Sequence, residues 1–154
     1  MESILMLSYD PRKISTAVYN NLKQVKEKTS KKEDHDKQKS QAVELYTFVA
    51  TWGLLRLAGE EPALSNELQK QAVVKCFFQT LGELAFPEEK PNPLVGMSKI
   101  EKLTHPKMNA SEYLGLTGFA LQVAREFSFW AEALYPKPST TGKTQANSTQ
   151  TAAK

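Results

Sequence analysis

The chain has 154 residues, of which 40% are hydrophobic and 24% are charged, and this globular composition excludes full-length disorder and low-complexity polymers. The length supports one ordinary domain and is too short for two well-filled ones. All 17 acidic residues lie before position 136, and only three of the 20 basic residues follow it, so the net charge of +3 belongs to the C-terminal segment and the part able to fold is neutral.

Cysteine usage and hydropathy indicate the compartment. The single cysteine, Cys76, excludes an intrachain disulfide and leaves a structural zinc site without its usual ligands. The first residues lack the basic start and the long apolar run of a secretory signal. The longest apolar stretch, residues 42–58, contains Glu44 and Arg56 and is shorter than the ~20 residues needed to cross a bilayer. We therefore expect a cytoplasmic protein that does not enter a membrane.

Helical periodicity begins close to the N-terminus. Apolar side chains at the spacing of one buried stripe predict a first helix over residues 12–28, and Pro11 suits its first turn because a missing N–H costs nothing there. Residues 29–40 follow, rich in lysines and acids and without a large apolar side chain. We expect this segment to contribute nothing to the core and to form a solvated loop or the exposed start of the next helix.

Two further long helices are predicted in the middle of the chain. The second covers residues 39–58, with Gly59 as its left-handed C-terminal cap. The third covers residues 63–86, beginning after Pro62 and ending before Pro87, because proline is tolerated at a helix start and disrupts a helix interior. Each helix has a face of regularly spaced apolar side chains, which predicts that both pack on the core.

A linker and a short helix come next. Residues 88–96 contain two prolines and cannot be helical throughout. Ser98 and Glu101 have the spacing of a capping box, in which a side chain at the helix start bonds a free backbone N–H. This spacing predicts a short helix that ends near Pro106.

The last helix has the strongest pattern in the chain. Asn109 and Glu112 again stand three residues apart at its start, and Pro136 ends it. Its main stripe repeats at spacings of three and four residues through Tyr113, Thr117, Ala120, Ala124, Phe127, Ala131 and Leu134. Further apolar side chains widen the stripe to nearly half the circumference, so we expect this helix to be central and contacted from several sides.

These patterns define the fold class. No stretch has the strict two-residue alternation of a half-buried strand. From Lys137 onward there is no large apolar side chain, so nothing offsets the cost of ordering the chain. We predict an all-α fold: a small bundle of four long helices plus one short helix in a single domain over residues 1–135, with a disordered C-terminal tail over residues 136–154.

Candidates for catalysis and metal binding are few. Cys76 and His105 could form a thiol–imidazole pair, but Cys76 is placed like a small core residue, and His105 lies at a helix end where its side chain can bond the last carbonyls. His35 stands between two aspartates in a charged segment, where neighbouring residues do not converge on one ion. No glycine-rich phosphate loop is present. We therefore predict no catalytic residue, no metal site and no cofactor, and a protein that is not an enzyme.

Basic residues are concentrated near the N-terminus. Residues 12–39 contain nine lysines or arginines against four acids, whereas residues 40–135 contain eight against eleven. Lysines outnumber arginines by 17 to three, and lysine binds phosphate as a point charge instead of reading base edges. Any nucleic-acid binding is therefore expected to be independent of sequence.

The last helix resembles a known family. It contains Tyr113-Leu-Gly-Leu-Thr117-Gly-Phe-Ala120-Leu121, followed by Phe127-Ser-Phe-Trp130-Ala131-Glu132-Ala133-Leu134. This order of a Tyr, then Thr, Ala and Leu, then an aromatic residue and Ala-Glu-Ala-Leu resembles the C-terminal signature of the small helical subunit of Cmr-type (type III-B) CRISPR effector complexes. The similarity extends over residues 12–135. Where the family commonly has two basic residues this chain has Gly118 and Phe129, and Arg125 is the nearest substitute.

The resemblance implies a non-catalytic subunit in antiviral defence. Its partners would be copies of itself and other subunits of the effector complex, stacked along a filament that holds the guide RNA–target RNA duplex while other subunits cleave the target. Small or surplus apolar positions at Gly115, Gly118, Phe119 and Phe129 would serve subunit packing. Basic residues able to reach solvent near the first and last helices would contact RNA, and these are Arg12, Lys13, Lys102, Lys107 and Arg125.

A second interpretation comes from a different class. The chain could be a small helical adaptor that binds a protein partner through its charged segment and tail, without nucleic acid. Salt dependence separates the two, because binding through phosphates weakens steeply between ~50 and ~200 mM salt whereas an apolar contact hardly responds.

Overall fold

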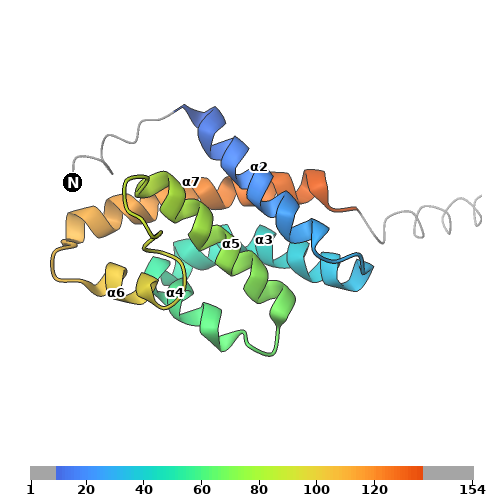
Figure 1. The fold of residues 1–154 in the computed structure, drawn as a ribbon, viewed down its shortest axis with the longest axis horizontal. Helices are drawn as coiled ribbons and strands as arrows, with labels where there is room; N and C mark the ends of the chain where they lie inside the picture. The colour runs from blue at the N-terminus through green and yellow to red at the C-terminus, as the bar shows by residue number, and fades with distance from the viewer. Residues whose placement is uncertain (1–9, 137–154) are drawn as a thin grey trace, which may run out of the picture.

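The computed structural model describes residues 10–136, and it contains six helices and no strand within that range. Figure 1 shows the arrangement, and the helices are α2 (Pro11–Glu27), α3 (Lys32–Trp52), α4 (Leu54–Ala63), α5 (Leu68–Ala85), α6 (Ser98–Thr104) and α7 (Ala110–Leu134). The all-α prediction is confirmed. The count differs, because two short helices, α4 and α6, accompany the four long ones. The predicted tail beyond Pro136 lies outside the described residues.

Helix α7 is the central element, as predicted from its wide apolar stripe. It runs along the long axis of the molecule, and α2, α3 and α5 all pack against it (Figure 1). Helices α4 and α6 contact each other at one end of the bundle. Phe127 of α7 is fully buried and lies 5.7 Å, ring centre to ring centre, from Phe77 of α5. Burial of such large side chains is the main source of stability for the bundle.

Two of the predicted helix starts, those at Pro11 and Asn109, are confirmed. Pro11 begins α2, and the side chain of Asp10 caps it by accepting the N–H of Arg12. The Asn109 side chain caps α7 by accepting the N–H of Glu112 at 2.9 Å. The capping box predicted at Ser98 is wrong, because Ser98 is already inside α6 and its hydroxyl donates to the carbonyls of Pro93 and Val95.

The charged segment after α2 forms the start of the next helix, which is one of its two predicted alternatives. Helix α3 begins at Lys32, and the His35 Nε2 atom lies 2.7 Å from the Thr29 carbonyl and 3.1 Å from the Lys26 carbonyl at the end of α2. Gln38 is buried, donates to Gln69 and accepts the Tyr135 hydroxyl. The prediction that this segment contributes nothing to the core is therefore wrong, because amide hydrogen bonds make burial of Gln38 possible without apolar character.

The predicted second helix is interrupted. Gly53 has φ 91° and ψ 163°, a conformation essentially restricted to glycine, and it separates α3 from α4. Gly59 does not end a helix: α4 continues through it and through Pro62 to Ala63. Helix α5 begins at Leu68 instead of residue 63. The break is supported from a distant part of the chain, because the Leu55 N–H donates to the Tyr113 hydroxyl of α7 at 2.9 Å.

Substitution of the two glycines should have opposite effects. Gly53→Ala should lower the free energy of unfolding by about 1–3 kcal/mol, because a side chain is strained at this backbone conformation. Gly59→Ala is the matched control: a Cβ there meets nothing within 4 Å, and alanine should stabilise the helix by roughly 0.5–1 kcal/mol. Urea unfolding of the two variants measures both effects, and equal free energies would contradict the assignment of Gly53 as the break.

Candidate nucleic-acid interface

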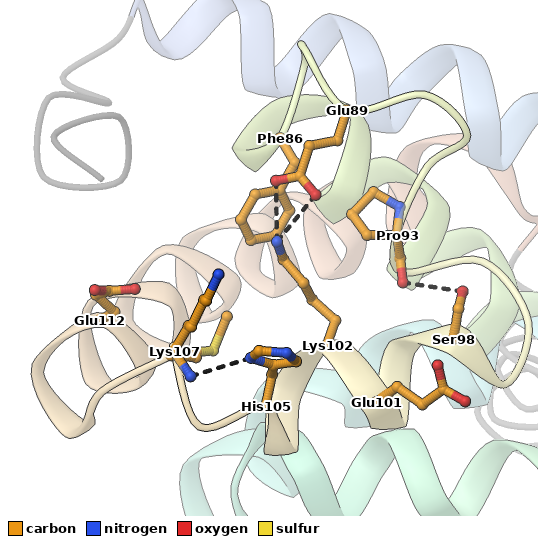
Figure 2. Close-up of a pocket in the computed structure, with 10 residues that line it drawn as sticks. Phe86, Glu89, Pro93, Ser98, Glu101, Lys102, His105, Lys107 and Glu112 are labelled. Atoms are coloured by element: carbon orange, nitrogen blue, oxygen red, sulfur yellow. Dashed lines mark hydrogen bonds and ion pairs between the residues drawn. The ribbon is translucent and has the colours of Figure 1, made fainter.

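The five basic residues predicted to contact RNA lie in three places. Arg12 and Lys13 are in the first turn of α2. Lys102 of α6 and Lys107 after it line one pocket (Figure 2). Arg125 lies on α7 beside Tyr46 of α3. The structure therefore places Arg12 with Lys13 and Lys102 with Lys107, and it does not gather the five residues into one surface.

Two of the five basic groups form ion pairs within the chain. The Arg12 guanidinium lies 2.6 Å from Asp10, which holds the pKa of that carboxyl below its usual value and raises the pKa of Arg12. Lys102 Nζ lies 2.9 and 3.0 Å from the two carboxylate oxygens of Glu89. A phosphate near either residue would meet a nearby negative charge, so their contribution to RNA binding is reduced.

The other three basic groups have no acidic partner among the described residues. The Arg125 guanidinium donates to the Tyr46 hydroxyl at 3.0 Å and stands 5.0 Å from the centre of that ring. Lys13 and Lys107 are exposed, and no ion pair with either side chain occurs within residues 10–136. Lys107 is therefore the best placed of the five to neutralise a phosphate, followed by Lys13, whose charge adds to the Arg12 hydrogen bonds in lowering the pKa of the nearby Asp10 carboxyl.

Aromatic side chains adjoin the basic face of α2, a feature that the sequence-based prediction missed. The Tyr19 ring of α2 lies 4.8 Å from the Trp130 ring of α7, and the Phe129 ring lies 5.0 Å from the Trp130 ring. Trp130 Nε1 donates to the Ser15 hydroxyl at 2.9 Å, which fixes the indole. We call Tyr19, Phe129 and Trp130 the aromatic edge.

The aromatic edge combines exposure with positive charge. Phe129 is 59% exposed. Lys23 Nζ stands 5.6 Å from the centre of the Tyr19 ring and 3.9 Å from the Glu27 carboxylate, with which it forms an exposed ion pair. Arg12 precedes Tyr19 by seven residues, which places both on the same side of α2. Rings beside cations are suited to stacking on nucleobases whose phosphates lie nearby. The signal available in the sequence was Phe129, an aromatic residue opposite the apolar stripe of its helix.

The pocket beside α6 has a volume of about 390 Å³, and we call it the α6 pocket (Figure 2). Phe86, Pro93 and Met108 supply apolar wall, and Lys102 Nζ stands 4.5 Å from the centre of the Phe86 ring. Glu112 also lines the pocket, and its Oε2 atom is buried without a hydrogen-bond partner among the described residues.

His105 stabilises a turn in a way that differs from the prediction. Its Nδ1 atom accepts the Lys107 N–H at 3.1 Å, so the ring satisfies a backbone donor beyond α6 instead of the last carbonyls of the helix. The carbonyl-capping role belongs to His35, whose ring contacts the Lys26 and Thr29 carbonyls. His105 lies at the α6 pocket, whereas Cys76 lines a separate groove between α2 and α5. The structure does not bring the two residues together.

Cys76 should be unreactive in the native protein. Its side chain is only 5% exposed, and burial raises the pKa of its thiol from 9.0 to about 12. The thiol form is therefore favoured in the folded state, so stability from this group is present below pH 9 and is lost as the pH rises towards 12. Reaction with a thiol reagent at pH 8 should be at least about a hundredfold slower in buffer than in denaturing urea. Equal rates would contradict burial of Cys76.

The positions expected to serve subunit packing divide into two groups. Phe119 is buried in the core, so that expectation is wrong for Phe119 within this fold. Gly118 and Phe129 lie on the outer face of α7, and a Cβ at Gly118 meets nothing within 4 Å. Close packing inside the monomer therefore does not explain Gly118. Leu114 is a further exposed apolar residue on α7.

Within residues 10–136, no group of three His, Cys, Asp or Glu side chains is arranged to hold a metal ion. No helix in that range combines the length and apolar character that crossing a bilayer requires. Comparisons of the chain with protein-family models, with characterised proteins and with solved structures find no match. The resemblance to the Cmr-type small subunit therefore depends on the residues of α7 quoted above.

Proposed function

We propose that the chain is a non-catalytic small subunit of a type III-B CRISPR effector complex in the cytoplasm, where several copies help hold the guide RNA–target RNA duplex. The choice of family depends on the α7 residues quoted above, and the observation that supports RNA binding is the aromatic edge beside α2. Tyr19 and Trp130 are in contact, Phe129 is exposed next to them, and Lys23 and Arg12 lie along the same side of α2. Stacking surfaces and phosphate charges of this kind bind nucleic acid without reading its sequence.

The nearly neutral charge of the fold explains why several copies of the subunit would be needed to bind RNA strongly. The described fold is nearly neutral, and Arg12, Lys23 and Lys102 are paired with acids, so one copy offers few phosphate contacts. Several copies in one complex present their contacts at high effective concentration, which raises the overall affinity without new interactions. An isolated subunit is therefore expected to bind RNA weakly, and the assembled complex strongly.

A protein-binding adaptor is the second candidate, and one surface favours it. Trp52 is 57% exposed, and the Arg56 guanidinium stands 5.1 Å from the centre of its ring. Both border an open hollow of about 690 Å³ together with Leu55, Ile100 and Tyr113. Tryptophan, tyrosine and arginine are enriched among residues that dominate the affinity of protein interfaces.

Substitutions at two sites, Phe129 and Trp52, distinguish the two functions. Phe129→Ala in the assembled complex should weaken target-RNA binding at low salt, because a stacking surface contributes about 1–3 kcal/mol per base. Leu114→Ala, also exposed on α7, is the matched control and should leave RNA binding unchanged. Fluorescence anisotropy with labelled target RNA measures both. Unchanged binding by Phe129→Ala, together with loss of a protein partner in Trp52→Ala, would favour the adaptor.

A further inference from the structure

We propose that the groove between α2 and α5, which we call the α2–α5 groove, binds a nucleotide. The phosphate is held by Lys28 and Lys75. The base meets the side-chain amides of Gln24 and Gln69. The ligand chemistry is one phosphate beside one hydrogen-bonding base, whether the nucleotide is free or belongs to an RNA strand. The groove is complete in one copy of the chain, so this site does not depend on the proposed function.

The α2–α5 groove has a suitable size and lies apart from the aromatic edge. Helices α2 and α5 pack side by side (Figure 1). The groove between them has a volume of about 400 Å³, which is within the ~300–1,000 Å³ typical of ligand sites and more than a bare phosphate fills. Gln24 and Lys28 line the groove on the side of α2 away from Tyr19, as 3.6 residues per turn require. A ligand in the groove therefore does not occupy the aromatic edge.

Two lysines give the groove positive charge. Lys28 follows the last residue of α2 and Lys75 lies on α5, and neither forms an ion pair within residues 10–136. None of the described residues that line the groove is acidic. Burial raises the pKa of the Cys76 thiol in the groove wall, and the charge of Lys28 acts on the same thiol in the opposite direction, so the ammonium group is close to that wall. A phosphate in the groove would meet two cations without a competing carboxylate in the lining.

Two acids outside the lining already accept hydrogen bonds from lining residues. Glu83 accepts the side-chain amides of Asn21 at 3.3 Å and Gln79 at 3.1 Å. The Asp34 carboxylate accepts the Thr29 hydroxyl at 2.9 Å. These polar groups of the lining are therefore in use, and recognition of a ligand depends on the two lysines and on other amides.

The Gln69 amide is one of these, and a chain of hydrogen bonds from the core holds it in place. The Tyr135 hydroxyl donates to Gln38 Oε1 at 2.6 Å, and Gln38 Nε2 donates to Gln69 Oε1 at 2.6 Å. Gln38 is only 1% exposed, so the chain is anchored in the interior. The NH2 group of Gln69 has no acceptor within residues 10–136. It is therefore a positioned donor for a carbonyl or ring nitrogen of a base.

Gln24 and an apolar wall complete the place for the base. Gln24 is exposed, and its side chain makes no hydrogen bond within residues 10–136. Its amide offers both a donor and an acceptor, as the edges of nucleobases do. The apolar side chains that line the groove are Val25, Leu68 and Ala72. Lysines, free amide groups and apolar wall together suit a nucleotide better than an inorganic anion or an uncharged apolar molecule.

Titration of the full chain with uridine 5′-monophosphate (UMP), whose base has carbonyl acceptors, tests the site. UMP should shift the side-chain amide resonances of Gln24 and Gln69 in NMR spectra. Uridine, which lacks the phosphate, and inorganic phosphate, which lacks the base, should each bind at least about tenfold more weakly. Absence of these shifts at millimolar UMP would overturn the proposal. Equal binding of UMP and phosphate, which indicates an anion site only, or of UMP and uridine would also overturn it.

A pair of lysine variants tests the phosphate contact. Lys28→Gln with Lys75→Gln should weaken UMP binding at least about tenfold, and both side chains are exposed, so the fold should be unaffected. Lys37→Gln with Lys90→Gln is the matched control, because it removes the same charge from exposed lysines that do not line the groove. The control should bind UMP normally. Equal weakening in both variants would reflect net charge alone and would overturn the assignment of the phosphate to Lys28 and Lys75.

A short single-stranded oligouridylate distinguishes the two sources of the nucleotide. Tighter binding than UMP, with the same shifts at Gln24 and Gln69, would assign the groove to an RNA strand. Weaker binding than UMP, or shifts confined to the Trp130 indole, would assign the groove to a free nucleotide. Target-RNA binding by the assembled complex is tested separately at Phe129, so failure of this site and failure of the proposed function can be told apart.

Discussion

Replacement of Lys99 by alanine should lower the free energy of unfolding by about 3–5 kcal/mol. Lys99 is fully buried, and its Nζ atom lies 3.0 Å from Glu61 Oε1 and 2.9 Å from the Gly96 carbonyl. It also stands 5.6 Å from the centre of the Phe78 ring. Without the ammonium group, the Glu61 carboxylate, which is only 8% exposed on its side chain, would remain buried without a cation. Chemical unfolding followed by circular dichroism measures the change.

Lys102→Ala is the matched control for the Lys99 substitution. Lys102 lies on the same short helix and also pairs with a glutamate, but its partner Glu89 is half exposed, so the expected loss is about 0–1 kcal/mol. Replacement of both Lys99 and Glu61 by apolar residues, as in Lys99→Met with Glu61→Leu, should recover most of the stability. A loss below about 1 kcal/mol for Lys99→Ala would contradict the view that this buried pair joins α6 to α4.

Local patterns were sufficient to predict α2 and α7. Their apolar stripes persist through several turns, and Pro11 and Asn109 supply the starts that the structure shows. In each case the helix can be predicted from its own residues. Regularly spaced apolar side chains define the face that is buried, and a capping side chain acts on the first turn of the same helix. The all-α class and the central place of α7 follow from the same evidence.

Long-range contacts determine the features that the sequence did not predict. The break at Gly53 interrupts a continuous apolar pattern and is supported by Tyr113, which is 58 residues from Leu55 in the chain. The Lys99–Glu61 pair joins residues 38 positions apart. Neither partner carries a local signal of the other, since any lysine and any glutamate could be solvated. Whether the two side chains pair or stay solvated depends on their burial, and this burial depends on the completed fold.

The candidate nucleic-acid interface likewise has features that the sequence predicts locally and features that depend on tertiary packing. Exposure of Lys13 and Lys107 could be predicted from their places at a helix start and in a turn. Neutralisation of Lys102 could not, because Glu89 comes from a proline-containing connection whose path is set by tertiary packing. The contact between Tyr19 and Trp130 likewise depends on how α2 lies across α7. The number of basic residues in the sequence therefore indicated where positive charge is concentrated, but it did not indicate which basic side chains form ion pairs with acids.

Removal of the two free lysines should weaken RNA binding by the assembled complex more than removal of two paired cations. Lys13→Gln with Lys107→Gln deletes two charges that form no ion pair within residues 10–136, although the charge of Lys13 acts on the nearby Asp10 carboxyl. Each lost phosphate contact should reduce the slope of log K against log salt by about 0.7–0.9, so the pair should reduce it by roughly 1.4–1.8 per copy. Affinity at ~50 mM salt should fall by about tenfold or more, since several copies contribute together.

Arg12→Gln with Lys102→Gln is the matched comparison, because it removes the same charge from residues paired with Asp10 and Glu89. Its effect on the salt slope should be smaller, since these cations are already neutralised by neighbouring acids. Sequence preference should not change in either variant, because lysine contacts phosphates and not base edges. Charge reversal at all five positions, including Arg125, sets the upper limit of the effect. Unchanged affinity and slope in that variant, with normal incorporation into the complex, would show that these residues are ordinary solvated charges and that the subunit has an architectural role alone.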